Sequence, residues 1–191
     1  MKTDIILSGV GGQGILSIAA VIGEAAVKEG LYMKQAEVHG MSQRGGDVQS
    51  NLRLSDKPVS SDLIPIGQAD LIISLEPMES LRYLPYLKKD GWLVTNSQPF
   101  VNIPNYPEMD KIHAELEKLP HKVVLDVEAI AKELGSPRVA NIVMLGAATP
   151  FLGIGYDKIA EGIRSVFARK NEEIIGLNLK ALQAGYDVAN R

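Results

Sequence analysis

The chain has 191 residues, of which 46% are hydrophobic and 23% are charged, and its formal net charge is −3 at pH 7. These values are typical of one globular domain without a basic surface for nucleic acid. Cysteine is absent, which excludes disulfides, a cysteine nucleophile, and an iron–sulfur or thiolate zinc site built from this chain alone. The start lacks a signal-peptide pattern and no apolar run reaches about 20 residues, so we expect a cytoplasmic protein that does not enter the membrane.

Strands and helices alternate along the chain. A strand over residues 4–7 is followed by a glycine turn and by a helix that begins at Ile15 and stops near Gly30. A second strand covers 31–38. Residues 48–54 alternate between apolar and polar side chains, which predicts a strand with one wet face, antiparallel because its connection is too short for a helix. Residues 69–75 are continuously apolar and predict a central parallel strand.

The remaining elements follow in the same manner. We predict a helix over 76–87, a strand over 92–96, a loop over 98–107, a helix over 111–119, a strand over 123–126, and helices over 127–134, 141–152, 157–168 and 171–189. The whole chain, 1–191, is therefore expected to form a single α/β domain. Its predicted fold is a three-layer α/β/α, Rossmann-like arrangement around a mostly parallel, mixed sheet.

A glycine cluster directly follows the first strand. Gly9, Gly11 and Gly14 occupy the first, third and sixth positions of the turn, with Gly12 and Gln13 between them. This spacing allows a tight turn and points the free N–H groups of a helix start at whatever lies over it. Three interpretations stay open: a dinucleotide site with Glu37 on the ribose, a purely structural turn, and contact with a partner subunit or a shared ligand.

A second polar cluster contains His39, Ser42, Gln43, Arg44, Gly45 and Gly46. Its cation, amide and hydroxyl can hydrogen-bond another chain's backbone or hold a carboxylate or phosphate. The alternative is an exposed turn between two strands. We find no nucleophile–base pair and assign no catalytic residue and no metal ligand; His113 and His121 lie among charges and are expected at the surface.

Asn141 precedes a segment that is apolar on nearly every side. Its side-chain oxygen is predicted to cap the helix over 141–152. A helix that is apolar on every face must be covered on every face. Burial inside this domain and docking on another subunit are both compatible with that composition.

Together the two clusters resemble one family. Gly9-Val10-Gly11-Gly12-Gln13-Gly14-Ile15, the segment 37–46, and the segment 141–147 are similar to the gamma subunit or domain of the 2-oxoacid (pyruvate, ketoisovalerate, 2-oxoglutarate):ferredoxin oxidoreductases. Within this family, the chain most resembles the stand-alone beta subunit of indolepyruvate:ferredoxin oxidoreductase. The resemblance covers nearly the whole length.

The resemblance implies a reaction and a set of partners. A 2-oxoacid is decarboxylated on thiamine diphosphate, electrons pass through iron–sulfur clusters to ferredoxin, and the acyl group goes to coenzyme A. The family places these cofactors on other domains, so this chain is expected to hold none alone and to dock on a large catalytic subunit. The amides of residues 11–14 and Arg44 would face that subunit, and the isolated chain is a possible homodimer. An independent NAD(P)- or FAD-binding enzyme and a nucleotide-sensing module are the alternative functions.

Overall fold

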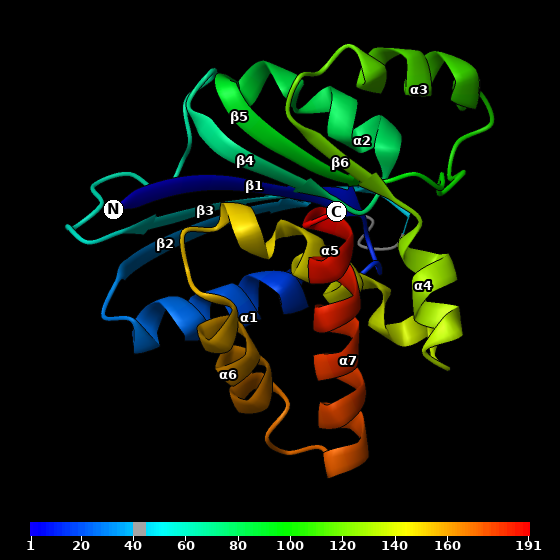
Figure 1. Ribbon diagram of the computed structural model, residues 1–191. Helices are drawn as coiled ribbons and strands as arrows, with labels where there is room; N and C mark the ends of the chain where they lie inside the picture. Colours follow the sequence, from blue (N-terminus) through cyan, green and yellow to red (C-terminus); the bar gives the residue numbers. More distant parts are fainter. Residues whose placement is uncertain (40–44) are drawn as a thin grey trace.

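The computed structural model describes residues 1–39 and 45–191. Within them six strands form one sheet in the order β2-β3-β1-β4-β5-β6 (Figure 1). In chain order the strands are β1 (Lys2–Val10), β2 (Tyr32–His39), β3 (Asp47–Ser55), β4 (Ala69–Ser74), β5 (Leu87–Asn96) and β6 (Lys122–Leu125). β1, β4, β5 and β6 run parallel, whereas β3 is antiparallel to both of its neighbours. The prediction of a mostly parallel, mixed sheet with one antiparallel strand is confirmed.

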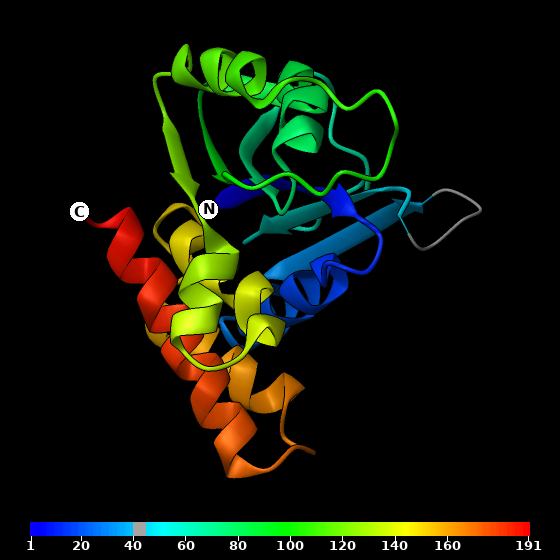
Figure 2. The ribbon, with the colours of Figure 1, turned by 90° about the vertical axis from the view of Figure 1, so that its right-hand side faces the viewer.

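Helices cover both faces of this sheet, which gives the predicted three layers (Figures 1 and 2). One face carries α1 (Ile15–Lys28), α4 (Val127–Glu133), α5 (Ala140–Ala148), α6 (Tyr156–Val166) and α7 (Glu172–Ala189). The other face carries α2 (Pro77–Arg82) and α3 (Met109–Glu117). In the part of the chain that the structure describes, every helix is too short or too polar to cross a bilayer.

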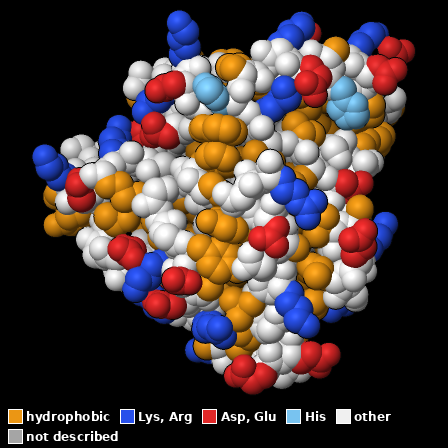
Figure 3. All heavy atoms as spheres, in the orientation of Figure 1, with side chains coloured by type: hydrophobic (Ala, Val, Ile, Leu, Met, Phe, Trp, Pro, Cys, Tyr) orange, Lys and Arg blue, Asp and Glu red, His pale blue; other side chains and the backbone are white. Residues whose placement is uncertain are grey.

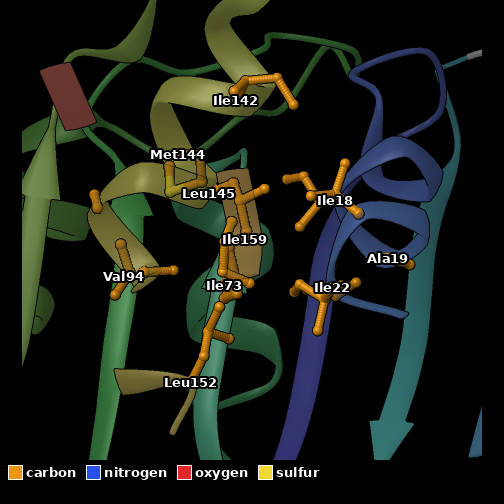
Figure 4. Packing of buried hydrophobic residues seen from close by; sticks show 14 of the residues in the cluster. Ile18, Ala19, Ile22, Ile73, Val94, Ile142, Met144, Leu145, Leu152 and Ile159 are labelled. Atoms are coloured by element: carbon orange, nitrogen blue, oxygen red, sulfur yellow. The ribbon is translucent and has the colours of Figure 1, made fainter. Parts of the chain in front are cut away.

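The larger core lies between the sheet and the α1 side. Figure 4 shows Ile18 and Ile22 of α1 directed toward Ile73 of β4 and Leu145 of α5. These side chains are at most 1% exposed, and burial of one such side chain contributes about 1.5–3 kcal/mol. A smaller core lies under α2 and α3.

The end of α1 is determined locally. The Gly30 N–H donates to the Val27 carbonyl at 3.0 Å and the Leu31 N–H donates to the Ala26 carbonyl at 2.9 Å. This pair of bonds requires a left-handed residue after the helix, and Gly30 has φ +71°. The predicted stop at Gly30 is therefore confirmed.

Some predictions about strands and helices were wrong. The face of β3 that was predicted to be exposed to solvent is largely covered: Asn51 and Arg53 are 3% and 8% exposed. The segment 61–64 covers them, since the Ile64 N–H donates to the Asn51 side chain and the Arg53 side chain donates to the Leu63 carbonyl. The helix predicted over 76–87 ends at Arg82. Pro85 lies in a following 3₁₀ turn (Leu84–Tyr86), and β5 begins at Leu87 instead of residue 92.

The apolar helix α5 is covered from within the chain. Gly146 and Gly185 lie at its crossing with α7, where a Cβ on Gly185 would approach the Val143 carbonyl oxygen to 1.9 Å. Two glycines thus bring the two backbones into direct contact. Residues 142–148 are buried, which favours burial inside this chain over docking of α5 on another subunit. Beyond Ala148 the predicted helix continues only as a 3₁₀ turn (Thr149–Phe151).

The surface carries charges of both signs. On the face drawn in Figure 3, Lys and Arg side chains are interspersed with Asp and Glu around the rim, and hydrophobic side chains run down the middle. That face offers no continuous basic stripe of the kind that follows a nucleic-acid backbone.

Candidate functional site

The glycine turn is held against the ends of two strands by Gln13. Its Oε1 accepts a hydrogen bond from the Val10 N–H at 2.7 Å, and its Nε2 donates to the Leu75 carbonyl at 3.0 Å. A Cβ on Gly9 would lie 2.7 Å from that Oε1, so glycine is required for Gln13 to reach this position. Gln13 therefore connects the ends of β1 and β4 within this chain.

The two glycine clusters lie side by side. The Gly11 N–H donates to the Gly46 carbonyl at 2.8 Å, and the Gly45 N–H donates to the Gly11 carbonyl at 3.4 Å. Asn102, from the segment between β5 and α3, donates its Nδ2 to the Gly45 carbonyl at 2.7 Å. Three segments that are distant in sequence thus form one edge, which we call the glycine edge: residues 9–14, Gly45–Gly46 and Asn102.

Part of the second cluster lies outside the described residues. This holds for Ser42, Gln43 and Arg44, and for the side chain of His39, which is the last residue of β2. For this cluster the structure places Gly45 and Gly46. Asn102 could not be found from sequence, because nothing in the loop over 98–107 distinguishes it from its polar neighbours.

Asn141 does not cap α5 as predicted. Val139 occupies the capping position, because a 3₁₀ turn (Pro137–Val139) leads directly into the helix. The Asn141 Nδ2 instead donates to the Gly14 carbonyl at 3.2 Å, across to the start of α1. Its Oδ1 is enclosed without a hydrogen-bond partner among the described residues. Asn141 thus adjoins the glycine edge and stabilises the conformation of Gly14, which has φ +90°.

Hollows flank the glycine turn on two sides. One, of about 310 Å³, is lined by Val10, Ile15, Leu16 and Val48, by glycines of the turn, and by Glu37. The other, of about 380 Å³, is lined by residues that include Gln13, Phe100, Glu128, Arg138 and Asn141. The first has apolar walls and one acidic group, so it suits an apolar group better than a phosphate. Glu37 lies near the turn as the dinucleotide interpretation required.

A buried carboxylate, that of Glu76, holds the loop that contributes Asn102 to the glycine edge. Glu76, fully buried, caps α2 by accepting from the Glu79 N–H at 2.8 Å, and it also accepts from the Tyr106 hydroxyl and the Phe100 N–H. Burial first, and then the hydrogen bond to Glu76, raises the pKa of Tyr106. Glu76 therefore fixes the segment that carries Asn102. From sequence it was interpreted only as the start of a helix.

A second acidic group lies where β3 leaves the glycine edge. Asp47 accepts hydrogen bonds from the Tyr83 hydroxyl at 3.1 and 2.9 Å. Burial, followed by the bond to Asp47, raises the pKa of Tyr83. Burial also raises the pKa of Glu79, although the hydrogen bonds from Arg82 act in the opposite direction. α2 is thus tied to the first residue after Gly46.

The two other histidines do not join this edge. His113 is exposed on α3, and the His121 ring packs on Trp92 with ring centroids 5.2 Å apart. Within residues 1–39 and 45–191, no three His, Asp or Glu side chains gather in a group that could hold a metal ion.

Comparisons with known proteins agree with the resemblance of the sequence. The family model described as pyruvate ferredoxin/flavodoxin oxidoreductase matches residues 4–188. The indolepyruvate oxidoreductase subunit IorB of Archaeoglobus fulgidus is 38% identical over 99% of this chain and 96% of its own length. The protein of the same name from Pyrococcus horikoshii is 37% identical over 97% of this chain and 95% of its own.

A solved structure agrees as well. The gamma subunit of a keto/oxoacid ferredoxin oxidoreductase from Geobacter sulfurreducens matches with a TM-score of 0.72 and 28% identity, covering 98% of both chains. The predicted resemblance and fold class are therefore confirmed.

Proposed function

The chain belongs to the pyruvate ferredoxin/flavodoxin oxidoreductase family, and on that premise we propose that it is the small accessory subunit of an indolepyruvate:ferredoxin oxidoreductase. The complex decarboxylates the 2-oxoacid, passes electrons to ferredoxin and transfers the acyl group to coenzyme A. The observation that carries this proposal is full-length similarity to two subunits named for indolepyruvate. The substrate is inferred from the names of those relatives.

The redox chemistry belongs to a large catalytic subunit. Iron–sulfur clusters need thiolate ligands, and this chain contains no cysteine. Thiamine diphosphate and the clusters are therefore assigned to the partner, and coenzyme A to the partner or to a site shared with this chain. In this arrangement the small subunit contributes binding and positioning.

The glycine edge is the surface that we assign to the catalytic subunit. Exposed apolar side chains flank it: Phe100 is 46% exposed and Val101 66%. Such a mixture of backbone amides and exposed apolar groups is typical of binding surfaces. The Gly11 N–H is already bonded to Gly46, so the amides of Gly12 and Gly14 are the candidates for an acidic group of the partner or ligand.

The residues between β2 and β3 complete the proposed surface. We assign to it His39, Ser42, Gln43 and Arg44, which precede Gly45 in the sequence, and Arg44 is proposed to meet a phosphate or a partner carboxylate. Bidentate pairing of a guanidinium with either anion is stronger than a neutral hydrogen bond. Asn141, which bonds the Gly14 carbonyl and lines the adjoining hollow, is also assigned to this surface.

Activity of the reconstituted complex tests the assignment of function. The chain is co-expressed with a candidate large subunit that carries thiamine diphosphate and cluster motifs, and reduction of ferredoxin is measured with indolepyruvate, pyruvate, 2-oxoglutarate and 2-oxoisovalerate. We expect coenzyme A-dependent turnover only when both subunits are present, with the highest kcat/KM for indolepyruvate. Turnover by this chain alone would contradict the accessory role, and a preference for another 2-oxoacid would contradict the substrate.

Arg44→Ala tests the docking surface. Loss of one charge-assisted contact of about 1.5–3 kcal/mol should raise either the Kd for the large subunit or the KM for coenzyme A by about 10- to 100-fold. Arg164→Ala is the matched control, because Arg164 is exposed on α6, and its neighbour Ser165 accepts a hydrogen bond from Lys28 at the end of α1 opposite to the glycine turn. If Arg44→Ala leaves both quantities as unchanged as the control does, the docking assignment is wrong.

A further inference from the structure

β2 is the terminal strand of the sheet, and no other strand among residues 1–39 and 45–191 pairs with its outer edge. Eight consecutive residues pair with β3 on one side without interruption, from Tyr32 opposite Ser55 to His39 opposite Val48. The outer N–H and C=O groups of such a strand form a template for another strand. The opposite edge is different, because β6 has four residues. A long, regular edge without proline is one that a protein must cover or protect.

β2 carries three exposed apolar side chains. Tyr32 is 51% exposed, Val38 56% and Met33 37%. Tyr32 and Val38 are both even-numbered and therefore project from the same face of the strand, which is the face where Lys34 donates to the Ser60 carbonyl at 3.2 Å. Met33 projects from the other face toward α1, where its sulfur lies 2.9 Å from the position of a Cβ on Gly23.

A stripe of α1 continues this surface. Leu16, Ala20, Gly23 and Val27 recur at helical spacing on one side of the helix. Because Gly23 contacts Met33, this stripe faces the β2 side of the sheet. Leu16 is 54% exposed and Val27 66%, and Ala20 is exposed as well. An open strand edge and an apolar helix flank thus lie together along the same side of the molecule.

We propose that this side binds the same side of a second copy of the chain, with the two β2 strands antiparallel about a twofold axis through Gln35. In an antiparallel pair related by a twofold axis, residues that lie opposite each other project from the same face of the sheet. Centred on Gln35, it pairs Tyr32 with Val38 of the second copy, and Lys34 with Ala36.

This register suits the chemistry of β2. An aromatic residue opposite a β-branched residue is a favourable cross-strand pair, and the symmetry forms it twice. Lys34 meets alanine rather than a second lysine. A register centred on Ala36 would place Lys34 opposite Val38 instead. On the α1 face, the axis brings the two apolar helix stripes toward each other, so the two six-stranded sheets join into one continuous sheet.

Disulfide trapping tests the register directly, because the natural chain has no cysteine. Residues opposite each other have Cβ atoms about 4.5–5.5 Å apart, so Gln35→Cys should form a covalent dimer under mild oxidation. Lys34→Cys is the control on the same strand. Its two thiols would sit on residues about 8 Å apart, beyond the reach of a disulfide, and should form a dimer only when Ala36→Cys is added.

The mass in solution supplies an independent measurement. Light scattering or sedimentation of the full chain should give twice the monomer mass of 20.7 kDa. Val38→Lys should weaken the dimer by about tenfold or more, because each dimer loses two Tyr32–Val38 pairs. Ile66→Lys is the matched control: Ile66 is 70% exposed but adjoins β4, on the far side of β1, and the variant should dimerise as the natural chain does.

Monomeric mass at the highest soluble concentration, or equal cross-linking of Gln35→Cys and Lys34→Cys, would overturn the proposal. Circular dichroism of each variant separates a lost interface from a lost fold. The interface uses β2 and one side of α1, and the experiments need no catalytic subunit. Failure of this proposal therefore leaves the accessory function untouched, and failure of the reconstitution experiment leaves the dimer untouched.

Discussion

Gly14→Ala should destabilise the chain through two separate effects. Gly14 has φ +90° and ψ 25°, a left-handed conformation that costs a residue with a Cβ about 1–2 kcal/mol. The added Cβ would also lie 2.6 Å from the Asn141 Nδ2, so Asn141 must rotate and lose its bond to the Gly14 carbonyl. That bond contributes about 0.5–1.5 kcal/mol. We therefore expect a loss of about 1.5–3.5 kcal/mol in the free energy of unfolding.

A double-mutant cycle separates the two effects. Asn141→Ala alone should cost about 1 kcal/mol or less, because the Gly14 carbonyl keeps the bond from the Ser17 N–H at 3.1 Å and the unpartnered Asn141 Oδ1 is removed. With Asn141 already truncated, Gly14→Ala should cost only the left-handed strain. The double variant should thus be more stable than the sum of the single changes predicts, by about 1 kcal/mol.

Urea denaturation with linear extrapolation measures each free energy of unfolding. Gly176→Ala is the matched control, because Gly176 lies within α7 with open space around its Cβ position. That variant should gain about 0.5–1 kcal/mol, as expected for glycine to alanine inside a helix. Additive single changes would refute the steric role of Asn141, and a cost of Gly14→Ala below about 0.5 kcal/mol would refute the whole argument.

Three further changes test the interior. Gly185→Ala forces a Cβ against the Val143 carbonyl, so α5 and α7 must separate; overpacking of this kind costs about 1–3 kcal/mol or more, measurable as a lower urea midpoint. Burial alone would raise the pKa of Asp4, but the hydrogen bonds from Arg53 and Lys2 outweigh burial, so the pKa is lowered in the folded chain. The ionised Asp4 therefore stabilises the fold above about pH 4, and the stability advantage of the natural chain over Asp4→Asn should shrink as the pH falls below that value. Burial raises the pKa of Glu79, so the advantage over Glu79→Gln should instead shrink as the pH rises above about 4.5. Urea titrations at several pH values check both signs.

Local signals predicted most of the fold. The stop at Gly30 depends on hydrogen bonds to Ala26 and Val27, and the central position of β4 follows from its continuous apolar run. Features that depend on distant segments were predicted less well. Arg53 appeared solvent-facing because alternation along β3 carries no information about the segment 61–64. There the Arg53 guanidinium bonds the Asp4 carboxylate and the Leu63 carbonyl.

The sequence identified the two glycine clusters of the candidate site, but it did not predict the contacts between them. Both glycine clusters are visible in the sequence, and their combination identified the family. Their mutual hydrogen bonds, between Gly11 and Gly46, could not be derived from spacing. The roles of Asn102 and Glu76 were also missed, because a single polar residue in a loop or at a helix start has many ordinary uses.

Side-chain amides tie the described segments of the glycine edge to one another and to the end of a strand. Gln13 connects the turn to the end of β4, and Asn102 connects Gly45 to the loop before α3. Asn96 at the end of β5 donates to the Glu128 carboxylate and accepts from the Val127 N–H, which fixes the start of α4 beside that loop. Glycine is thus used here for close approach of backbones rather than for looseness. A surface held in this way loses little conformational freedom when it binds, so more of its contact energy would remain available as affinity for the catalytic subunit that we propose as its partner.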